Sequence, residues 1–165
     1  MRQSLRTMDA GSGVARTDLD QWLDQHSATQ TIAVYSPLPG EVDLLPIIHR
    51  YPDRCWVYPK IRGLELTFHE VKNPDTDLLP GAFRILEPRD ELPEVPITHV
   101  DAFLCPGLAF DPNGGRLGRG RGFYDRILAK ARPDAVKIGI CFKEQMVSDT
   151  FSEPHDVRMD KVICG

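Results

Sequence analysis

The stretches that decide the fold are Val100-Asp-Ala-Phe-Leu-Cys105 and, after a glycine-rich loop, Val136-Lys-Ile-Gly-Ile-Cys-Phe142. Both are short runs of apolar and β-branched residues, which is typical of buried strands. Between them, residues 124–131 favour a helix. Strand, loop, helix and strand in this order predict a right-handed βαβ crossover and therefore a mostly parallel sheet.

Further elements are expected towards the N-terminus. Residues 31–35 and 55–58 are β-rich runs, and residues 64–68 alternate between apolar and polar side chains, as half-exposed strands do. Helices are expected at 18–26 and at 41–50, although Pro46 weakens the second prediction. Residues 72–96 hold five prolines and many acidic residues, and we expect mostly loop there, interrupted by Phe83-Arg-Ile-Leu86.

The length and composition favour one soluble domain. The chain has 165 residues, 41% of them apolar and 27% charged, as expected for a globular protein with one core. Residues 1–16 are polar and contain Gly11-Ser12-Gly13, so we expect an N-terminal arm with a flexible join, followed by a single α/β domain over residues 17–165. No apolar stretch is long enough to cross a membrane, and no signal peptide is recognisable, which favours a cytoplasmic protein.

Charge and cysteine content exclude other classes. The formal net charge of −4 argues against a general nucleic-acid binder, which is usually basic. The four cysteines are Cys55, Cys105, Cys141 and Cys164, and no two of them form a CxxC pair. We therefore expect reduced thiols packed in the core rather than a zinc site. A cysteine nucleophile stays an open alternative, because no histidine is paired with any of them by the sequence.

The loop between the two deciding strands carries the chemistry. Residues 114–122 read Gly-Gly-Arg-Leu-Gly-Arg-Gly-Arg-Gly. The segment from Gly114 to Arg132 contains six basic residues and only one acidic residue. Glycine permits positive φ and close backbone approach, so successive N–H groups can bind an anion. Arginine presents a planar set of donors that matches phosphate oxygens. The spacing fits neither a Walker loop nor GxGxxG, so the loop predicts phosphate binding without naming a reaction. A solvated basic loop that contacts nucleic acid is the alternative.

A longer motif surrounds this loop and resembles a known signature. Pro106-Gly-Leu-Ala-Phe-Asp-Pro-Asn-Gly-Gly-Arg-Leu-Gly-Arg-Gly-Arg-Gly-Phe-Tyr-Asp125 is similar to the signature of the 5-formyltetrahydrofolate cyclo-ligases, also called 5,10-methenyltetrahydrofolate synthetases. The resemblance covers about residues 31–165, with a weaker match at residues 2–6. The supporting segments are Val34-Tyr35 with Glu41, Tyr58-Pro59-Lys60, Leu86-Glu87-Pro88, Phe142-Lys-Glu-Gln145, and His155-Asp156 with Asp160.

The resemblance implies a three-layer, Rossmann-like domain with a mostly parallel sheet of the NagB/RpiA-like type. It also implies a reaction: the ATP- and Mg²⁺-dependent conversion of 5-formyltetrahydrofolate to 5,10-methenyltetrahydrofolate, with release of ADP and phosphate. In that chemistry the formyl oxygen takes the γ-phosphoryl group, and N10 then attacks the activated carbon. Phosphoryl transfer needs mainly positioning and charge neutralisation.

The family's site residues carry over onto matching positions of this chain. The residues implied as catalytic are Arg116, Arg119, Arg121 and Tyr124. Those implied for ATP are Arg2, Arg6, Gly115, Arg116, Leu117, Gly118, Arg119, Gly120, Arg121 and Gly122. Those implied for the folate are Ser36, Glu41, Tyr58, Gly118, Gly120, Gly122, Phe123 and Tyr124. Those implied for Mg²⁺ are Asp125 and Asp156.

The sequence departs from the family's pattern in two places. Phe123 stands where the family usually has the first of two tyrosines, and Arg2 and Arg6 stand in for a longer basic segment that leads to the first strand. Plain structural roles stay open for four of these residues: Tyr124 in helix packing, Glu41 at a helix start, Asp125 as an acid in the first turn of a helix, and Asp156 in a turn.

Two other functions also stay open. One is a non-catalytic folate- or nucleotide-binding homologue, and the other is a sugar-phosphate-binding enzyme of the same architecture. The expected partners are ATP and a reduced folate, without nucleic acid or membrane, in a monomer or a homodimer.

Overall fold

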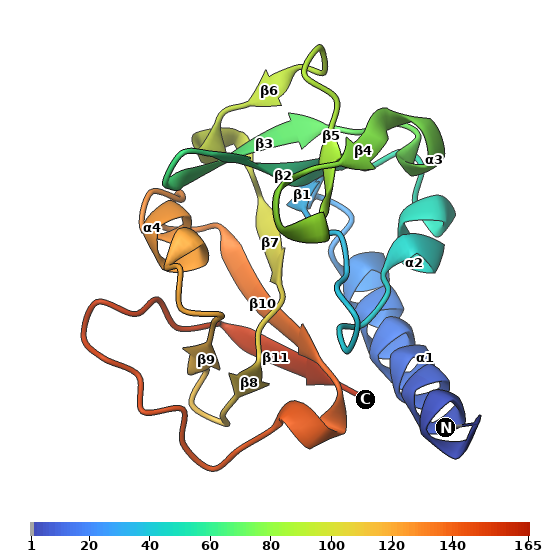
Figure 1. The fold of residues 1–165 in the computed structure, drawn as a ribbon, viewed down its shortest axis with the longest axis vertical. Coiled ribbons are helices and arrows are strands. Elements are labelled where there is room, and N and C mark those ends of the chain that lie inside the picture. The colour runs from blue at the N-terminus through green and yellow to red at the C-terminus, as the bar shows by residue number, and fades with distance from the viewer. Residues whose placement is uncertain (1) are drawn as a thin grey trace.

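The computed structural model describes the backbone of residues 2–165 and the side chains from Ser12 onward (Figure 1). Its helices are α1 (Arg2–Gln25), α2 (Leu45–Arg50), α3 (Pro74–Asp77) and α4 (Phe123–Leu128). Its first six strands are β1 (Thr31–Ala33), β2 (Cys55–Arg62), β3 (Glu65–Glu70), β4 (Leu78–Pro80), β5 (Leu86–Pro88) and β6 (Glu94–Val95). The remaining strands are β7 (Ala102–Cys105), β8 (Ala109–Phe110), β9 (Arg116–Leu117), β10 (Val136–Cys141) and β11 (Lys161–Cys164).

A central sheet organises the molecule. Its strand order is β11-β10-β7-β1-β2-β3-β6. The pairs from β11 to β2 are parallel, whereas β2–β3 and β3–β6 are antiparallel. The two strands that decided the sequence prediction, β7 and β10, are direct neighbours with α4 between them in the chain. The predicted mostly parallel α/β fold is therefore confirmed.

Both faces of the sheet are covered, which gives three layers. Ile32 and Val34 belong to one buried cluster, together with residues of α1 and α2. Ala33, between them in sequence, belongs to a second cluster with Ile127 of α4. This alternation follows from the two-residue period of a strand. Figure 1 shows α1 and α2 on one side of the sheet and α4 on the other. A strand buried on both faces reads as a continuous apolar run, as β7 and β10 do.

The N-terminal segment differs from the prediction. No flexible join interrupts it, because α1 continues through Gly13 and across the boundary that the sequence placed between residues 16 and 17. Ala15, Leu19 and Leu23 follow one another at intervals of four, and all three are fully buried. Packing of this apolar stripe against the sheet outweighs the weak helix propensity of glycine. Arg2 and Arg6 lie outside the described side chains.

Two other segments are more ordered or shorter than expected. The helix predicted at 41–50 begins only at Leu45, and Pro46 lies in its first turn, where proline leaves no hydrogen bond unmade. The predicted loop at 72–96 contains α3 and the three short strands β4, β5 and β6.

All four cysteines are free, and Cys105 and Cys141 are buried, as predicted. No helix of the described residues is long and apolar enough to span a bilayer.

The glycine-rich loop is fixed to the sheet at its base. β8 and β9 pair as a short hairpin there, and Phe110 of β8 is fully buried. A Cβ atom on Gly139 of β10 would lie 2.4 Å from the Phe110 ring carbon Cε1. Only glycine therefore leaves room for the ring, and this contact places the hairpin on the sheet.

Replacement of Gly13 by Ala tests the continuity of α1. We expect Gly13→Ala to stabilise the protein by about 0.5–1 kcal/mol, because alanine is the better helix former and nothing lies within 4 Å of the added Cβ. Urea unfolding followed by circular dichroism measures the change. The contrasting variant Gly139→Ala should lose stability through its clash with Phe110. A loss of stability at Gly13 would contradict the continuous helix.

Candidate active site

A cavity of about 620 Å³ opens at the carboxyl end of the parallel strands. The chain leaves β1 towards β2 on one side and later returns to β7 on the other, so β1 and β7 are the neighbours at which the strand order reverses. Tyr35 and Ser36, which follow β1, line the cavity together with Pro106 and Gly107, which follow β7. Ligands of open α/β sheets bind at such a switch point, and the volume suits a small molecule.

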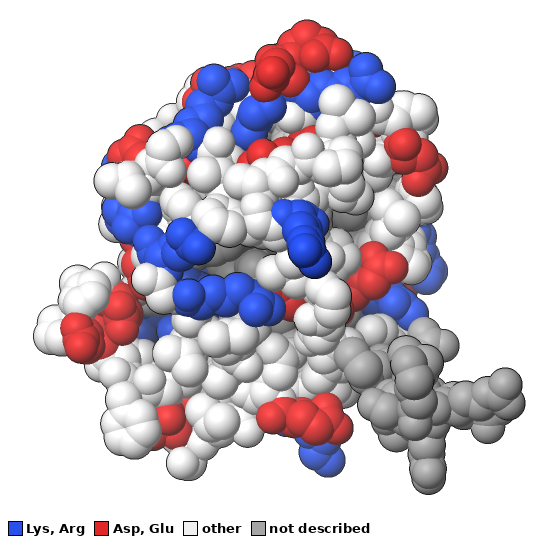
Figure 2. Space-filling view, viewed as in Figure 1, with Lys and Arg blue, Asp and Glu red and all other residues white. Residues whose placement is uncertain are grey.

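One wall of the cavity is cationic. The loop from Arg116 to Gly122 lines it, and Lys and Arg side chains surround the hollow in the molecular surface (Figure 2). Gly120 and Gly122 have φ values of 89° and 69°, a left-handed conformation that costs other residues energy. Glycine is thus required at both positions for the loop to follow this path.

Arg116 lies beneath the loop. Its exposed fraction is only 9%, and its Nη1 donates to the carbonyl oxygen of Pro106 at 3.0 Å. The guanidinium carbon lies 5.2 Å from the centre of the Tyr124 ring. Its buried Nε has no hydrogen-bond partner among the described residues. Such an orphaned donor costs free energy unless a ligand satisfies it. Burial raises the pKa of the Tyr124 hydroxyl, which therefore stays protonated at neutral pH.

Glu41 supplies a buried carboxylate on the opposite side. Its side chain is 7% exposed, its Oε2 accepts a hydrogen bond from the Leu38 amide at 2.9 Å, and Arg119 Nη2 lies 3.2 Å from its Oε1. A buried carboxylate is costly unless it is paired. Arg119 is 47% exposed, so its partner can be exchanged for another donor without burying the arginine.

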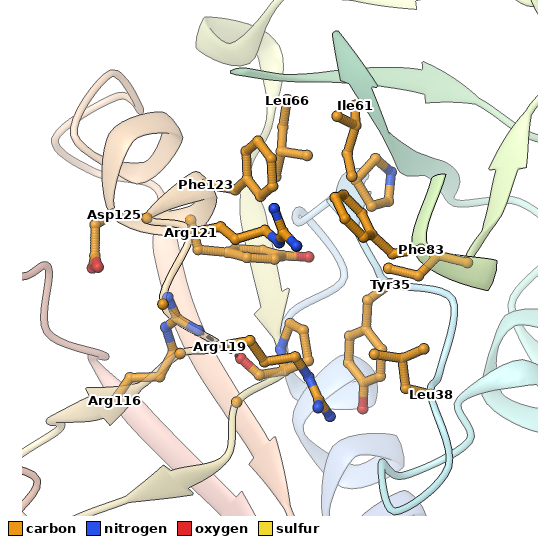
Figure 3. A pocket seen from close by; sticks show the side chains of 18 of the residues that line it. Tyr35, Leu38, Ile61, Leu66, Phe83, Arg116, Arg119, Arg121, Phe123 and Asp125 are labelled. Carbon is orange, nitrogen blue, oxygen red and sulfur yellow. Dashed lines mark hydrogen bonds between the residues drawn. The ribbon is translucent and has the colours of Figure 1, made fainter. Parts of the chain in front are cut away.

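The remaining wall is apolar and aromatic. Pro59, Ile61, Leu66, Ile85, Phe83 and Phe123 line it. In Figure 3, Ile61, Leu66 and Phe123 lie on one side of the cavity, Arg116 and Arg119 lie on the other, and Arg121 points towards Phe83. The guanidinium carbon of Arg121 is 3.8 Å from the centre of the Phe83 ring.

Phe83 lies at the tip of the β4–β5 hairpin. Ile85 N donates to the Ala82 carbonyl oxygen, and both residues between them have positive φ, 56° for Phe83 and 61° for Arg84. Such turns favour Asn-Gly, because each ordinary residue held in this conformation costs about 1–2 kcal/mol. The turn is held by buried Glu87, whose carboxylate accepts hydrogen bonds from the amides of Ile61 at 2.7 Å and Ala82 at 3.4 Å.

Two carboxylates reach the cavity from the α4 side. Asp125 Oδ1 accepts a hydrogen bond from the Val157 amide at 3.2 Å, which brings the turn with His155 and Asp156 next to the start of α4. Asp156 Oδ2 accepts from the Glu153 amide. Among the described side chains, no cluster of three or more His, Cys, Asp or Glu could hold a metal ion. One or two carboxylates are nevertheless enough for Mg²⁺ when phosphate oxygens and water complete its shell.

Asp111 connects the base of the glycine loop to the segment that leads to Asp156. Its Oδ1 accepts from the amides of Asn113 and Gly115, and its Oδ2 accepts from the amide and the hydroxyl of Thr150. Burial alone would raise the pKa of Asp111, but the hydrogen bonds from Thr150 and from the two loop amides outweigh it and lower the pKa to about 2.

Comparisons with known proteins agree with this geometry. Residues 8–165 match the sequence profile of the 5-formyltetrahydrofolate cyclo-ligase family. The chain belongs to this family. The sequence resemblance is thereby confirmed, and the chain is a member of a family of ligases.

Individual relatives support the assignment over nearly the whole chain. The 5-formyltetrahydrofolate cyclo-ligase of Mycolicibacterium smegmatis is 34% identical over 81% of this chain and 73% of its own. The Haemophilus influenzae protein of that name is 28% identical over 99% and 97%. An Aquifex aeolicus 5,10-methenyltetrahydrofolate synthetase structure superposes with a TM-score of 0.80 at 32% identity, covering 92% of this chain and 76% of that one.

Most site residues carried over from the family meet in this one cavity. Those that line it are Ser36, Glu41, Arg116, Leu117, Gly118, Arg119, Gly120, Arg121, Gly122, Phe123, Tyr124, Asp125 and Asp156. Tyr58 is instead buried in the core cluster on the α1 and α2 side. Gly115 is also outside the lining, and its amide is already bonded to Asp111. Glu41 precedes α2 instead of starting it, so the helix-start alternative for this residue is wrong.

Several residues that shape the site have no role predicted from the sequence. Phe83, Leu38 and Ile61 line the cavity, and Glu87 both lines it and fixes the turn below Phe83. Asp111 lies within the quoted motif, and its Asp-Pro-Asn-Gly context signals a turn. Its bond to Thr150, 39 residues away, has no sequence signal.

Asp111→Asn tests the connection between the loop base and Thr150. An amide cannot accept all four hydrogen bonds, and we expect a loss of about 1–3 kcal/mol in the free energy of unfolding at neutral pH. Because the folded pKa is depressed to about 2, the carboxylate stabilises the fold above about pH 4 and loses this effect as the pH falls towards 2.

The difference in stability between Asp111→Asn and the unaltered protein should therefore shrink as the pH falls from about 5 to about 2. Chemical unfolding at several pH values measures it. Asp134→Asn is the matched control, since Asp134 is an exposed carboxylate in a surface salt bridge with Arg132 and should change stability little. A pH-independent difference would contradict the role of the Asp111 charge.

Proposed function

We propose that this chain catalyses the ATP- and Mg²⁺-dependent conversion of 5-formyltetrahydrofolate to 5,10-methenyltetrahydrofolate, releasing ADP and phosphate. The observation that carries the proposal is one cavity in which an apolar, aromatic wall faces a loop of glycines and arginines. A flat heterocycle and a polyphosphate need these two environments side by side. Family membership and the names of the relatives support the same reaction.

The folate is assigned to the side of the cavity that holds Glu41 and the apolar wall. A reduced pterin presents ring N–H groups and a flat face with apolar character. The buried Glu41 carboxylate accepts such N–H donors, while Ile61, Leu66 and Phe123 exclude water from the ring. A ligand donor that replaces Arg119 on Glu41 keeps this buried charge paired.

The triphosphate is assigned to the loop. Arg119 and Arg121 have exposed side chains on the cavity wall, and the amides of Gly118, Gly120 and Gly122 follow the same backbone. Their N–H groups neutralise the charge that spreads over the transferring phosphoryl oxygens. Arg116 adds a buried positive charge below the loop and a free Nε donor.

The reaction then has two steps. The formyl oxygen attacks the γ-phosphorus, the bond to the bridging oxygen breaks, and ADP leaves. N10 attacks the activated formyl carbon, its proton passes to solvent, and phosphate leaves with the former formyl oxygen. A formamide oxygen is a poor leaving group, so the first step is what makes ring closure feasible. The residues of this chain position the formyl oxygen, N10 and the γ-phosphoryl group, and they stabilise the negative charge on the phosphoryl oxygens.

The carboxylates of Asp125 and Asp156 supply the hard oxygen donors that Mg²⁺ prefers, and both residues line the cavity next to the loop. When bound, Mg²⁺ would neutralise charge on the phosphate oxygens. Asp125 and Asp156 would hold it at the α4 side, and their hydrogen bonds to the amides of Val157 and Glu153 fix their orientation.

The direct test of the function is a turnover assay. Protein is mixed with ATP, Mg²⁺ and 5-formyltetrahydrofolate, and the absorbance of the methenyl product is followed. We expect product only when all three are present. Folded protein that forms no ATP-dependent product would reject the proposal. Ligand binding without turnover, measured by calorimetry, would favour a non-catalytic homologue.

Arg121→Ala tests the phosphoryl-binding role of the loop. We expect turnover to fall by at least about tenfold, because one charged donor to the transition state is removed, while thermal stability stays unchanged. Lys130→Ala is the matched control: this basic residue follows the same loop but pairs with Glu65 on the surface, outside the cavity. Equal activity of the two variants would show that the role is wrongly assigned.

Asp125→Asn and Asp156→Asn test the metal assignment. Each should raise the Mg²⁺ concentration that gives half-maximal turnover, because one anionic oxygen donor is lost. Titration of Mg²⁺ at saturating ATP and folate measures this value. If neither variant changes it, other groups hold the metal.

A further inference from the structure

We propose that Phe83 is a positioning residue for the nucleotide: the face of its ring holds the Arg121 guanidinium in the cavity in the orientation that binds phosphate. The proposal rests on the function proposed above and adds to it a residue from a different element, the β4–β5 hairpin. It commits Phe83 to the phosphate side of the cavity rather than to the folate.

The tip of the β4–β5 hairpin has a strained conformation. Phe83 and Arg84 occupy two left-handed positions that favour Asn and Gly. The surrounding hydrogen bonds from the Ile61 and Ala82 amides to Glu87 keep the turn in place. Backbone strain that the structure maintains in this way concentrates at functional sites. The turn alone would thus favour a different residue at position 83, and the presence of an aromatic ring there points to a role outside the turn.

The Phe83 ring is in close contact with the Arg121 guanidinium. The guanidinium carbon is 3.8 Å from the ring centre, well inside the distance over which a cation is attracted to an aromatic face. Phe83 is 50% exposed, so the ring is not part of the core. Figure 3 shows the two side chains approaching each other from opposite walls of the cavity.

The contact with Phe83 leaves the N–H donors of Arg121 free. Stacking uses the face of the guanidinium, whereas phosphate binds to the N–H groups at its edge. Each of the two neighbouring arginines donates to a protein group in this structure: Arg119 to Glu41, and Arg116 to the Pro106 carbonyl. Among residues 12–165, the Arg121 side chain makes no hydrogen bond or salt bridge, and it contacts the ring of Phe83. Arg121 is thus held in place with all its donors available.

Holding Arg121 in place lowers the cost of binding. A free arginine loses rotamer freedom when a phosphate captures it. An arginine already stacked on Phe83 has lost much of that freedom before the ligand arrives. Phe83 should therefore strengthen nucleotide binding without touching the nucleotide.

The experiment measures the dissociation constant of a non-hydrolysable ATP analogue with Mg²⁺, by calorimetry and without folate. We expect Phe83→Leu to weaken binding about three- to tenfold, the effect of losing a partly exposed cation–π contact together with preorganisation. Phe83→Trp, which keeps an aromatic face, should bind the ATP analogue with about the affinity of the unaltered protein. Leu79→Ala is the matched control, because Leu79 is similarly exposed on the same hairpin. Thermal unfolding confirms that all variants are folded.

A double-mutant cycle separates action through Arg121 from a general effect. Phe83→Leu should cause no further loss of nucleotide affinity when combined with Arg121→Gln. In turnover assays Phe83→Leu should raise the KM for ATP more than the KM for 5-formyltetrahydrofolate. Unchanged nucleotide affinity in Phe83→Leu, or an equal loss in the Arg121→Gln background, would overturn the inference. Failure of the unaltered protein to bind the analogue would instead count against the proposed function.

Discussion

The buried carboxylate of Asp111 joins two parts of the chain that the sheet alone would leave independent. A loop with five glycines has a large conformational entropy in the unfolded chain, and something must hold it in one conformation. Asp111 does so by accepting the amides at the loop base and the amide and hydroxyl of Thr150. The same bonds position the segment that carries Asp156, so the cationic and acidic sides of the cavity depend on one group.

The three arginines of the loop are held by three different interactions. A backbone carbonyl fixes Arg116, a buried carboxylate fixes Arg119, and an aromatic face fixes Arg121. Three positive charges in one small cavity repel each other. Each guanidinium is kept in place by its own partner, so the three side chains do not move apart. A phosphate that enters meets charges whose positions are already determined, which is the condition for strong electrostatic stabilisation.

The parts of this structure that the sequence predicted are those with a strong local signal. The apolar runs of β7 and β10 and the glycine spacing at Gly118, Gly120 and Gly122 each indicate their conformation within a few residues. The continuity of α1 could not be read from Gly13, because burial of Leu19 and Leu23 against the sheet decides it. The β4–β5 hairpin was missed because Phe83 and Arg84 are not turn-forming residues. Its stability comes from Glu87 and from β2, which are contacts between distant segments.

The close packing of Phe110 against Gly139 links two positions that are 29 residues apart in the sequence. Neither position is free to vary alone: a side chain at 139 displaces the ring, and a smaller residue at 110 leaves a void under the loop. Evolutionary drift at this point must therefore proceed through paired replacements. Related sequences that carry a larger residue at the position of Gly139 should carry a smaller one at the position of Phe110, or else anchor their glycine-rich loop in another way.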